Sequence, residues 1–451
     1  MSTAVSAPGK VLLAGGYLVL DREYTGLVFG LSARIHVLVH NIDSSAGEQL
    51  SEIRVESPQF QDAAWNYGYR LAGEQGGVGV TQLEEATTPI SRNPFVETAL
   101  LYGLTYISKV LPPSTTITPT RITIFADNDY YSHSPSSSSS TATPTTTTNQ
   151  KSFSNFGVRL QDAHKTGLGS SAALVTAFTG ALLSHYLPSS TFSLNRPACR
   201  SILHNLSQAS HCAAQGKIGS GFDVAAAVYG TCVYRRFSPS ILSSLGEPGT
   251  AGFATRVQEI VEDTSSSVKW DTTISKDDVS IPAGMALVMC DVDCGSQTVS
   301  MVKKVLEWRS KSPEESKALW DELQLYNETL GTSLASSSNS ALPAAFAAIR
   351  TRIRKMGTES GVPIEPEEQT LLLDAVTAGV DGVVGGVVPG AGGYDAVVLL
   401  VKDDEVTLGA LDVFLKKWKE EGKGNVKLLG ARGELEGARL EDVGEYAGVA
   451  L

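Results

Sequence analysis

The sequence predicts an α+β fold, on the basis of three observations. The chain opens with two long stretches rich in β-branched and large apolar residues, which are typical of strands. It continues with apolar residues at helical spacing, interrupted by further short strand-like stretches. No internal repeat recurs along its 451 residues, a length that allows roughly two or three domains with cores of their own.

The first half of the chain is expected to hold strands and helices in mixed order. Strands are predicted at 11–20, 26–39, 121–125, 156–160 and 225–234, and helices at 94–110, 172–187 and 197–215. Gly216, directly after the third of these helices, is a typical C-terminal cap. The stretch 132–150 is almost pure Ser, Thr and Pro, which cannot bury a core, so a disordered surface loop is expected there.

The second half is expected to form a separate domain. Strands are predicted at 285–291 and 396–401, and helices at 298–309, 314–330, 342–356 and 367–378. The irregular and polar stretch 238–280 separates the two halves, and the boundary is placed in its first part. The predicted domains are therefore residues 1–245 and residues 246–451.

Composition and charge limit the possible partners. The formal net charge of −12 opposes binding to nucleic acid and to acidic membrane surfaces. No apolar run approaches the roughly 20 residues of a membrane span, and the first residues lack the pattern of a signal peptide. The five cysteines are scattered, which indicates reduced structural thiols. We therefore expect a cytoplasmic protein that is a monomer or a homodimer.

The most specific motif is Lys165-Thr-Gly-Leu-Gly-Ser-Ser-Ala-Ala173, which lies directly before an apolar helix. Its glycines let the backbone turn tightly and approach a ligand, and the helix start offers unpaired N–H groups that bind phosphate. The hydroxyl of Ser170 or Ser171 could hold Mg²⁺. A simple Gly-Ser turn with a Ser cap is the alternative. The spacing fits neither a Walker A loop nor a nucleophile elbow.

Three further segments contain chemically useful residues. Asp223 ends the Gly-rich turn 219–223 where a strand is expected to begin, so it is placed to orient a nucleophile or assist a metal. Local turn hydrogen bonds are the alternative for this residue. Lys10 ends the segment 7–10 at the start of the first strand, where it points into a cleft or into solvent. A second Gly-rich segment, at 388–395, leads into a strand.

Together and in this order, these segments resemble the motifs of the GHMP kinases. Residues 7–10 are similar to the first motif of that superfamily, 165–173 to its phosphate loop and 390–395 to its third motif. The resemblance spans nearly the whole chain. It implies an N-terminal ribosomal-protein-S5-like domain and a C-terminal ferredoxin-like domain, with ATP and substrate bound between them.

Finer features resemble the fungal members of one GHMP family, the phosphomevalonate kinases. The opening run APGKVLLAGGYLVLDREYTGLVFGLSARIH has Gly16-Tyr17 where mevalonate kinase and galactokinase relatives have a Glu-His pair. Other similar runs are 126–131, 291–298 and 360–366. The chain departs from the pattern at Ala163, where a proline is usual, and near His211, where mevalonate kinase relatives have an acidic magnesium ligand.

The resemblance implies transfer of the γ-phosphoryl group of ATP to (R)-5-phosphomevalonate, with Mg²⁺, giving 5-diphosphomevalonate and ADP. It implies Lys10 and Asp223 as catalytic residues and Ser171 as the metal ligand. The implied ATP contacts are Lys165, Gly167, Leu168, Gly169, Ser170, Ser171 and Ala172. The implied substrate contacts are Lys10, Tyr17, Ser220, Ser296, Thr298, Gly392 and Gly393. The alternatives are a GHMP kinase acting on an alcohol, such as mevalonate or a sugar, and an inactive relative that senses ligand.

Overall fold

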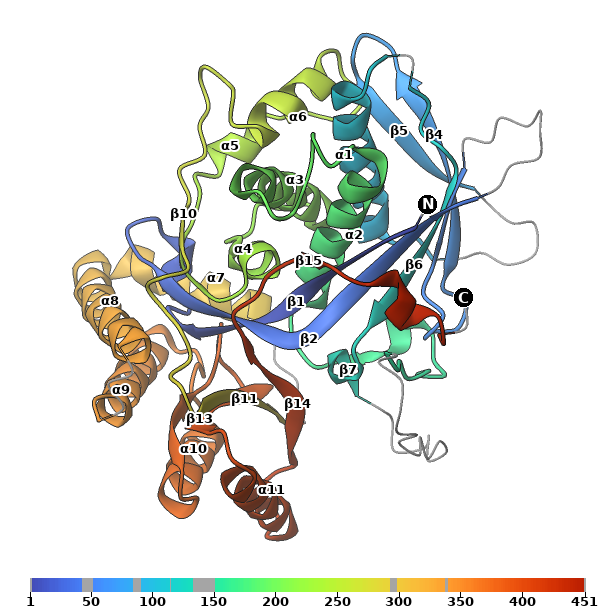
Figure 1. Cartoon of the computed structure of the whole chain (residues 1–451). Helices are drawn as coiled ribbons and strands as arrows, with labels where there is room; N and C mark the ends of the chain where they lie inside the picture. The colour runs from blue at the N-terminus through green and yellow to red at the C-terminus, as the bar shows by residue number, and fades with distance from the viewer. Residues whose placement is uncertain are drawn as a thin grey trace.

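The computed structural model describes residues 2–42, 52–83, 91–113, 115–132, 151–292, 298–336 and 340–449. Within these ranges it confirms the α+β class (Figure 1). The strands are β1 (Ser2–Ala14), β2 (Gly26–Asn41), β3 (Glu52–Glu56), β4 (Ala64–Ala72), β5 (Gly77–Leu83), β6 (Thr120–Ala126), β7 (Tyr131–Ser132), β8 (His164–Lys165), β9 (Cys232–Arg235), β10 (Thr273–Ser275), β11 (Met285–Val292), β12 (Val383–Val387), β13 (Ala396–Lys402), β14 (Val426–Glu434) and β15 (Arg439–Leu440). The α-helices are α1 (Pro94–Val110), α2 (Ser170–Tyr186), α3 (Pro197–Gln215), α4 (Phe222–Tyr229), α5 (Ser240–Ser243), α6 (Phe253–Val261), α7 (Thr298–Lys311), α8 (Pro313–Ala335), α9 (Leu342–Ser360), α10 (Glu367–Gly379) and α11 (Glu405–Glu420).

The long hairpin of β1 and β2 is the centre of the fold. Its strands pair antiparallel, from Ser2 opposite His40 to Ala14 opposite Leu27. The main path of the sheet runs β12-β13-β11-β14-β2-β6-β3-β4-β5, so β14 joins the C-terminal strands to β2. The two halves of the chain therefore contribute to one connected sheet.

Helices cover this sheet in two places. Helices α1, α2 and α3 pack together beside the β1–β2 hairpin, and α2 contacts both of its strands (Figure 1). Helix α6 packs against α1 and α3 although it follows position 245. A smaller core lies between the strands β11 and β13 and the helices α10 and α11. The division of the chain at 245/246 remains a prediction.

Capping residues at the helix ends explain why the predicted limits of these helices agree with the structure. Helix α1 begins after Asn93, whose side chain accepts a hydrogen bond from the N–H of Val96, and it has Pro94 in its first turn. Helix α3 ends at Gly216, which has a φ of 64° and is in the left-handed conformation of a C-terminal cap. The helices predicted in the second half are also confirmed, as α7, α8, α9 and α10.

Two predicted strands are wrong. Residues 225–234 form the helix α4 followed by the short strand β9. This helix packs against β1, α2 and α3, so it is buried on every side and its apolar run resembles a strand. Residues 156–160 form no strand, because their backbone bonds go to an irregular neighbouring segment: Phe156 N–H donates to Gln59 O at 3.0 Å, and Gln61 N–H to Val158 O at 2.9 Å.

The first strand also differs from its prediction. It begins at Ser2 and ends at Ala14, and the short 3₁₀ helix η1 (Leu18–Leu20) follows. Lys10 therefore lies inside a strand, where its backbone is fixed by pairing with Gly30. The Ser/Thr-rich stretch lies, apart from its first residue, outside the described residues.

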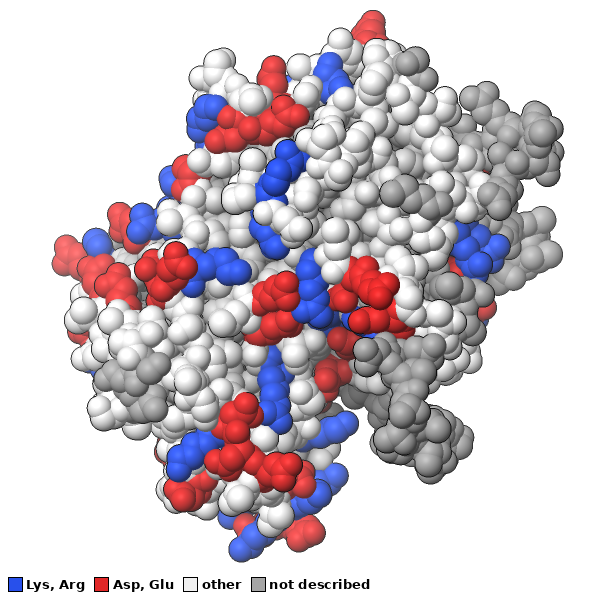
Figure 2. All heavy atoms as spheres, in the orientation of Figure 1, with Lys and Arg blue, Asp and Glu red and all other residues white. Residues whose placement is uncertain are grey.

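The described cysteines and the surface agree with the composition. Cys199, Cys212, Cys232 and Cys290 are free, buried thiols. Figure 2 shows Lys and Arg side chains interspersed with Asp and Glu on the face that it presents. None of the helices in the described ranges has the length and apolarity needed to cross a bilayer.

Candidate active site

The phosphate loop lies at the N-terminus of α2. Gly167 and Gly169 have φ angles of 75° and 82°, in the left-handed region that glycine adopts without strain. Gly169 is the N-terminal capping residue of α2, and no side chain caps the helix. The first N–H groups of α2 are therefore available to an anion, and the helix dipole favours negative charge at this point.

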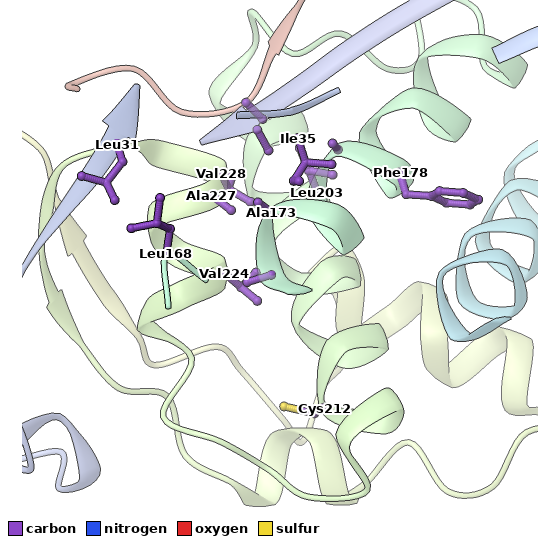
Figure 3. Close-up of a cluster of buried hydrophobic side chains, with 14 of the residues drawn as sticks. Leu31, Ile35, Leu168, Ala173, Phe178, Leu203, Cys212, Val224, Ala227 and Val228 are labelled. Carbon is purple, nitrogen blue, oxygen red and sulfur yellow. The ribbon is translucent and has the colours of Figure 1, made fainter. Parts of the chain in front are cut away.

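Leu168 anchors the loop to the core. Its side chain is 1% exposed and belongs to a buried cluster that includes Leu31, Ala173 and Val224 (Figure 3). Its backbone oxygen accepts a hydrogen bond from the backbone N–H of Lys10 at 2.8 Å. The loop is therefore tied to β1, and Leu168 has only its backbone to offer to a ligand.

Lys10 lies against the phosphate loop. Its ammonium group donates a hydrogen bond to the backbone oxygen of Gly167 at 3.2 Å. A Cβ atom at position 169 would lie 2.9 Å from both Cγ and Cε of Lys10, so this position has no room for a side chain. Burial lowers the pKa of Lys10 below its ordinary value, while the charge of Asp223 acts in the opposite direction.

Asp223 lies in the first turn of α4 and not at the mouth of a strand, as the sequence predicts. Gly221 caps this helix with a φ of 86°, and a Cβ atom there would lie 2.7 Å from the hydroxyl of Tyr234. The carboxylate accepts a hydrogen bond from the N–H of Val224 at 3.0 Å. The backbone of a tightly packed glycine turn therefore fixes Asp223, and the helix dipole stabilises its negative charge.

His211 lies between Ser171 and Asp223. Its Nε2 is 3.1 Å from Oγ of Ser171, and its Nδ1 is 3.9 Å from Oδ2 of Asp223. The ring is 2% exposed and stacks on Phe95, and the amide of Gln215 lies 3.2 Å from Nε2. Because its ring cannot move freely, His211 fixes the orientation of the Ser171 hydroxyl.

A cavity of about 260 Å³ lies on the helix side of the phosphate loop. Lys165, Ser170 and Ser171 line it from the loop and from the first turn of α2. The rest of the wall has an aromatic and apolar part that includes Phe60, Trp65, Phe95, Tyr131, Leu160 and Leu174, and a polar part that includes Asp62, Arg92 and Arg159. A planar apolar group with an attached phosphate chain suits such a cavity.

A larger cavity, of about 660 Å³, includes Thr166 and Gly167 of the same loop. It is lined by three cations, Lys10, Lys217 and Arg236, and by the carboxylates Asp223 and Asp395. Residues of both halves of the chain form its walls, including Met289, Val302 and Gly390. Because Lys165 lines one cavity and Thr166 the other, the phosphate loop is the element at which the two cavities meet.

Tyr17 connects the N-terminal segment to the Gly-rich loop at the wall of the larger cavity. Its φ of 67° is rare for a residue with a side chain, and its hydroxyl donates to the backbone oxygen of Ala391 at 2.7 Å. Burial raises the pKa of Tyr17, so the hydroxyl stays protonated and remains a donor. A Cβ atom at Gly16 would lie 2.1 Å from the oxygen of Gly390, which shows how closely the two segments approach.

The structure brings most of the predicted site residues together. Those that line the larger cavity are Lys10, Tyr17, Gly167, Ser220, Asp223 and Gly392, and those that line the smaller one are Lys165, Ser170 and Ser171. Four predicted contacts line neither cavity. Leu168 and Ala172 are buried in the core, Gly169 lies against Lys10, and Gly393 donates its N–H to Ile364 O at 2.9 Å. Thr298 begins α7, but its side chain and the whole of Ser296 lie outside the described residues.

Sequence reasoning missed Lys217 and Arg236 as site residues. Arg236 follows β9 and Lys217 follows the glycine that ends α3, so neither lies in a recognisable motif. His211 was noted only as a departure from a family pattern. The tertiary contacts of these residues place them at the site, and no local signal in the sequence identifies them.

Comparison with known proteins identifies the family. Residues 154–231 match the family described as GHMP kinases N terminal domain. A phosphomevalonate kinase of Gibberella zeae is 57% identical over 99% of this chain and 98% of its own length. One of Aspergillus fumigatus is 47% identical over the same shares of the two chains.

Solved structures share the fold at low sequence identity. The Streptococcus pneumoniae phosphomevalonate kinase in complex with phosphomevalonate and AMPPNP has a TM-score of 0.60 and 15% identity, over 96% of this chain and 99% of that chain. The Lin0012 protein of Listeria innocua has a TM-score of 0.67 and 16% identity, over 98% and 100%. The predicted GHMP kinase fold is confirmed, and the full-length fungal relatives show that this chain belongs to the phosphomevalonate kinase family of the GHMP kinases.

Proposed function

We propose that this chain transfers the γ-phosphoryl group of ATP to the phosphate of phosphomevalonate. The observation that carries the proposal is the pair of cavities that meet at one phosphate loop. Phosphoryl transfer depends mainly on holding two substrates in line and on neutralising charge. Two cavities lined by neighbouring residues of one phosphate loop support that arrangement.

ATP is assigned to the smaller cavity. Its aromatic and apolar wall suits the adenine base, and Lys165, Ser170 and Ser171 lie at its loop end, where the phosphates would be held. The phosphate chain would then lie on the N-terminus of α2, whose dipole and free N–H groups stabilise anions. The γ-phosphate would face the larger cavity.

The acceptor is assigned to the larger cavity. The second pKa of a phosphomonoester is near 6, so its phosphate is mostly dianionic at pH 7 and needs little deprotonation. Its approach to ATP is opposed by charge repulsion, which makes cations at the meeting point the main requirement. Lys10 is the cation that touches the phosphate loop and lines this cavity, so we assign it to charge neutralisation.

Mg²⁺ fits the loop end of the ATP cavity. This ion prefers oxygen ligands and usually combines one or two protein oxygens with substrate phosphates and water. Ser171 offers a hydroxyl that His211 orients, and no cluster of three or more His, Cys, Asp or Glu side chains forms a protein cage within the described ranges. When bound with ATP, Mg²⁺ would supply positive charge to the phosphates.

The Asp223→Asn variant tests whether Asp223 orients the reacting groups or acts as an essential general base. A dianionic phosphate needs no general base, so Asp223 would act by orienting Lys10 and the acceptor. We expect kcat to fall by less than the roughly 10²–10⁴-fold that loss of an essential base costs. The measurement is kcat from steady-state kinetics, and an unchanged melting temperature would show that the variant is folded. Complete loss of activity in that folded variant would show that Asp223 is indispensable and contradict its orienting role.

The oligomeric state and the cellular compartment of the protein remain predictions. The expectation is a monomer or a homodimer in the cytoplasm. An Arabidopsis thaliana relative, 33% identical over 90% of this chain, is named "Phosphomevalonate kinase, peroxisomal". Gel filtration and imaging of a tagged full-length chain would check both predictions.

A further inference from the structure

Arg236 lines the larger cavity, and two backbone carbonyl groups hold its guanidinium group in place. Its Nη1 donates to the backbone oxygen of Leu20 at 2.8 Å and its Nη2 to that of Gly219 at 3.0 Å. These two bonds come from separate segments, so they fix the plane of the guanidinium group. The side chain is half-buried and lines the cavity that we assign to the acceptor.

The guanidinium group has donors to spare. It carries five N–H donors, of which Leu20 and Gly219 accept one from each Nη. The second N–H of each Nη remains for a ligand, while the buried Nε has no hydrogen-bond partner in the described part of the chain. Within the same part, Arg236 forms no ion pair with a carboxylate, whereas Lys10 feels the charge of Asp223. A half-buried charge with only neutral partners is costly, and a planar anion that binds in the cavity would compensate it.

Two of the three cations of the larger cavity, Lys10 and Arg236, are held by different parts of the site. Lys10 is bonded to the phosphate loop at Gly167, where phosphoryl transfer would occur. Arg236 is bonded to η1 and to the turn before α4. Phosphomevalonate has matching chemistry, because it carries a phosphate at one end of its carbon chain and a carboxylate at the other.

We propose that Arg236 binds the carboxylate of the acceptor and sets the specificity of the site for phosphorylated carboxylic acids. The inference rests on the proposed function. The guanidinium plane, already fixed by two carbonyl groups, presents its remaining N–H groups to a planar carboxylate. Lys10 and the phosphate loop then receive the opposite end of the substrate, so the acceptor is oriented by both of its charged groups.

The test compares Arg236→Gln with the wild type on two acceptors, phosphomevalonate and its carboxamide analogue, in which the carboxylate is neutral. For Arg236→Gln we expect the KM for phosphomevalonate to rise about 10- to 100-fold, the range expected for loss of a charged hydrogen bond. The KM for ATP is expected to change less than about threefold, because ATP is assigned to the other cavity. The wild type should prefer phosphomevalonate strongly over the amide, and the variant should lose most of that preference.

Arg235→Gln is the matched control, because Arg235 is an exposed arginine at the end of β9, directly before Arg236, and lines neither cavity. Its kinetics are expected to equal those of the wild type. An unchanged KM for phosphomevalonate in Arg236→Gln would overturn the inference. An equal rise in KM for both acceptors would also overturn it, since Arg236 would then bind the phosphate end. Failure of the wild type to use phosphomevalonate at all would instead overturn the proposed function.

Discussion

Replacement of Lys10 by Met is expected to lower kcat by roughly 10²–10³-fold, the usual effect of removing one group that stabilises transition-state charge. Lys10 lines the larger cavity and donates a hydrogen bond to the phosphate loop at the backbone oxygen of Gly167. Without its charge, the repulsion between the acceptor phosphate and the γ-phosphate would be unscreened. Met keeps most of the length and apolar volume of the side chain, so the fold should persist.

Lys165→Met is the control for this prediction. Lys165 lines the smaller cavity and is exposed, so its loss should raise the KM for ATP more than it lowers kcat. Steady-state kinetics with both substrates varied would separate the two effects. If Lys10→Met raised only the KM for ATP and left kcat intact, Lys10 would belong to nucleotide binding and the assigned role would be wrong.

The second large effect is expected for Gly169→Ala. A Cβ atom at this position would lie 2.9 Å from Cγ and Cε of Lys10, and the φ of 82° opposes any L side chain. Lys10 must therefore move away from the loop, and a displacement of about 1 Å in a catalytic group costs about 10²-fold in rate. We expect kcat to fall by at least about 10²-fold, measured by ADP release at saturating ATP and acceptor.

Gly167→Ala is the matched control for backbone strain. Gly167 has nearly the same φ, 75°, but a Cβ atom there would meet no atom within 4 Å. In both variants alanine must adopt the left-handed backbone conformation, which destabilises the fold by about 1–2 kcal/mol. Only Gly169→Ala also displaces Lys10. A similar loss of kcat in the two variants would show that strain alone explains the effect and would remove the argument for Lys10.

Sequence patterns predicted the helices better than the strands. Helix α3 runs from Pro197 to Gln215, as predicted, because a proline near its start and a glycine directly after its end fix its limits locally. Strands β4 and β5 were not predicted. They pair with each other through Gly68 opposite Thr81 and Leu71 opposite Val78, and such pairing stabilises stretches that have little strand pattern of their own.

The sequence predicts a strand at 225–234, where the structure has helix α4 and the short strand β9. The reason for this error also concerns the site. A short helix with neighbours on every side has no polar face, so its sequence lacks the helical period. Asp223 was therefore identified as a site residue while its element was misassigned. Its position is still set by the glycine turn that the sequence does show.

The site could be predicted only where its residues lie in a local motif. The glycines and serines of the phosphate loop act together because they are neighbours in the chain. His211 and Arg236 reach the loop or the cavity through contacts between distant segments, such as His211 with Ser171 and Arg236 with Leu20. Such contacts depend on the complete sheet and its covering helices, and no local pattern contains them.

The most direct test of the central claim is ADP release with Mg-ATP and a panel of four acceptors. Phosphomevalonate, mevalonate, galactose and homoserine would be compared under the same conditions, with ATP binding measured separately. The two cavities and the cations of the larger one predict turnover with phosphomevalonate alone. Comparable turnover with mevalonate, or ATP binding without turnover on any acceptor, would contradict the assignment of a phosphate acceptor to the larger cavity.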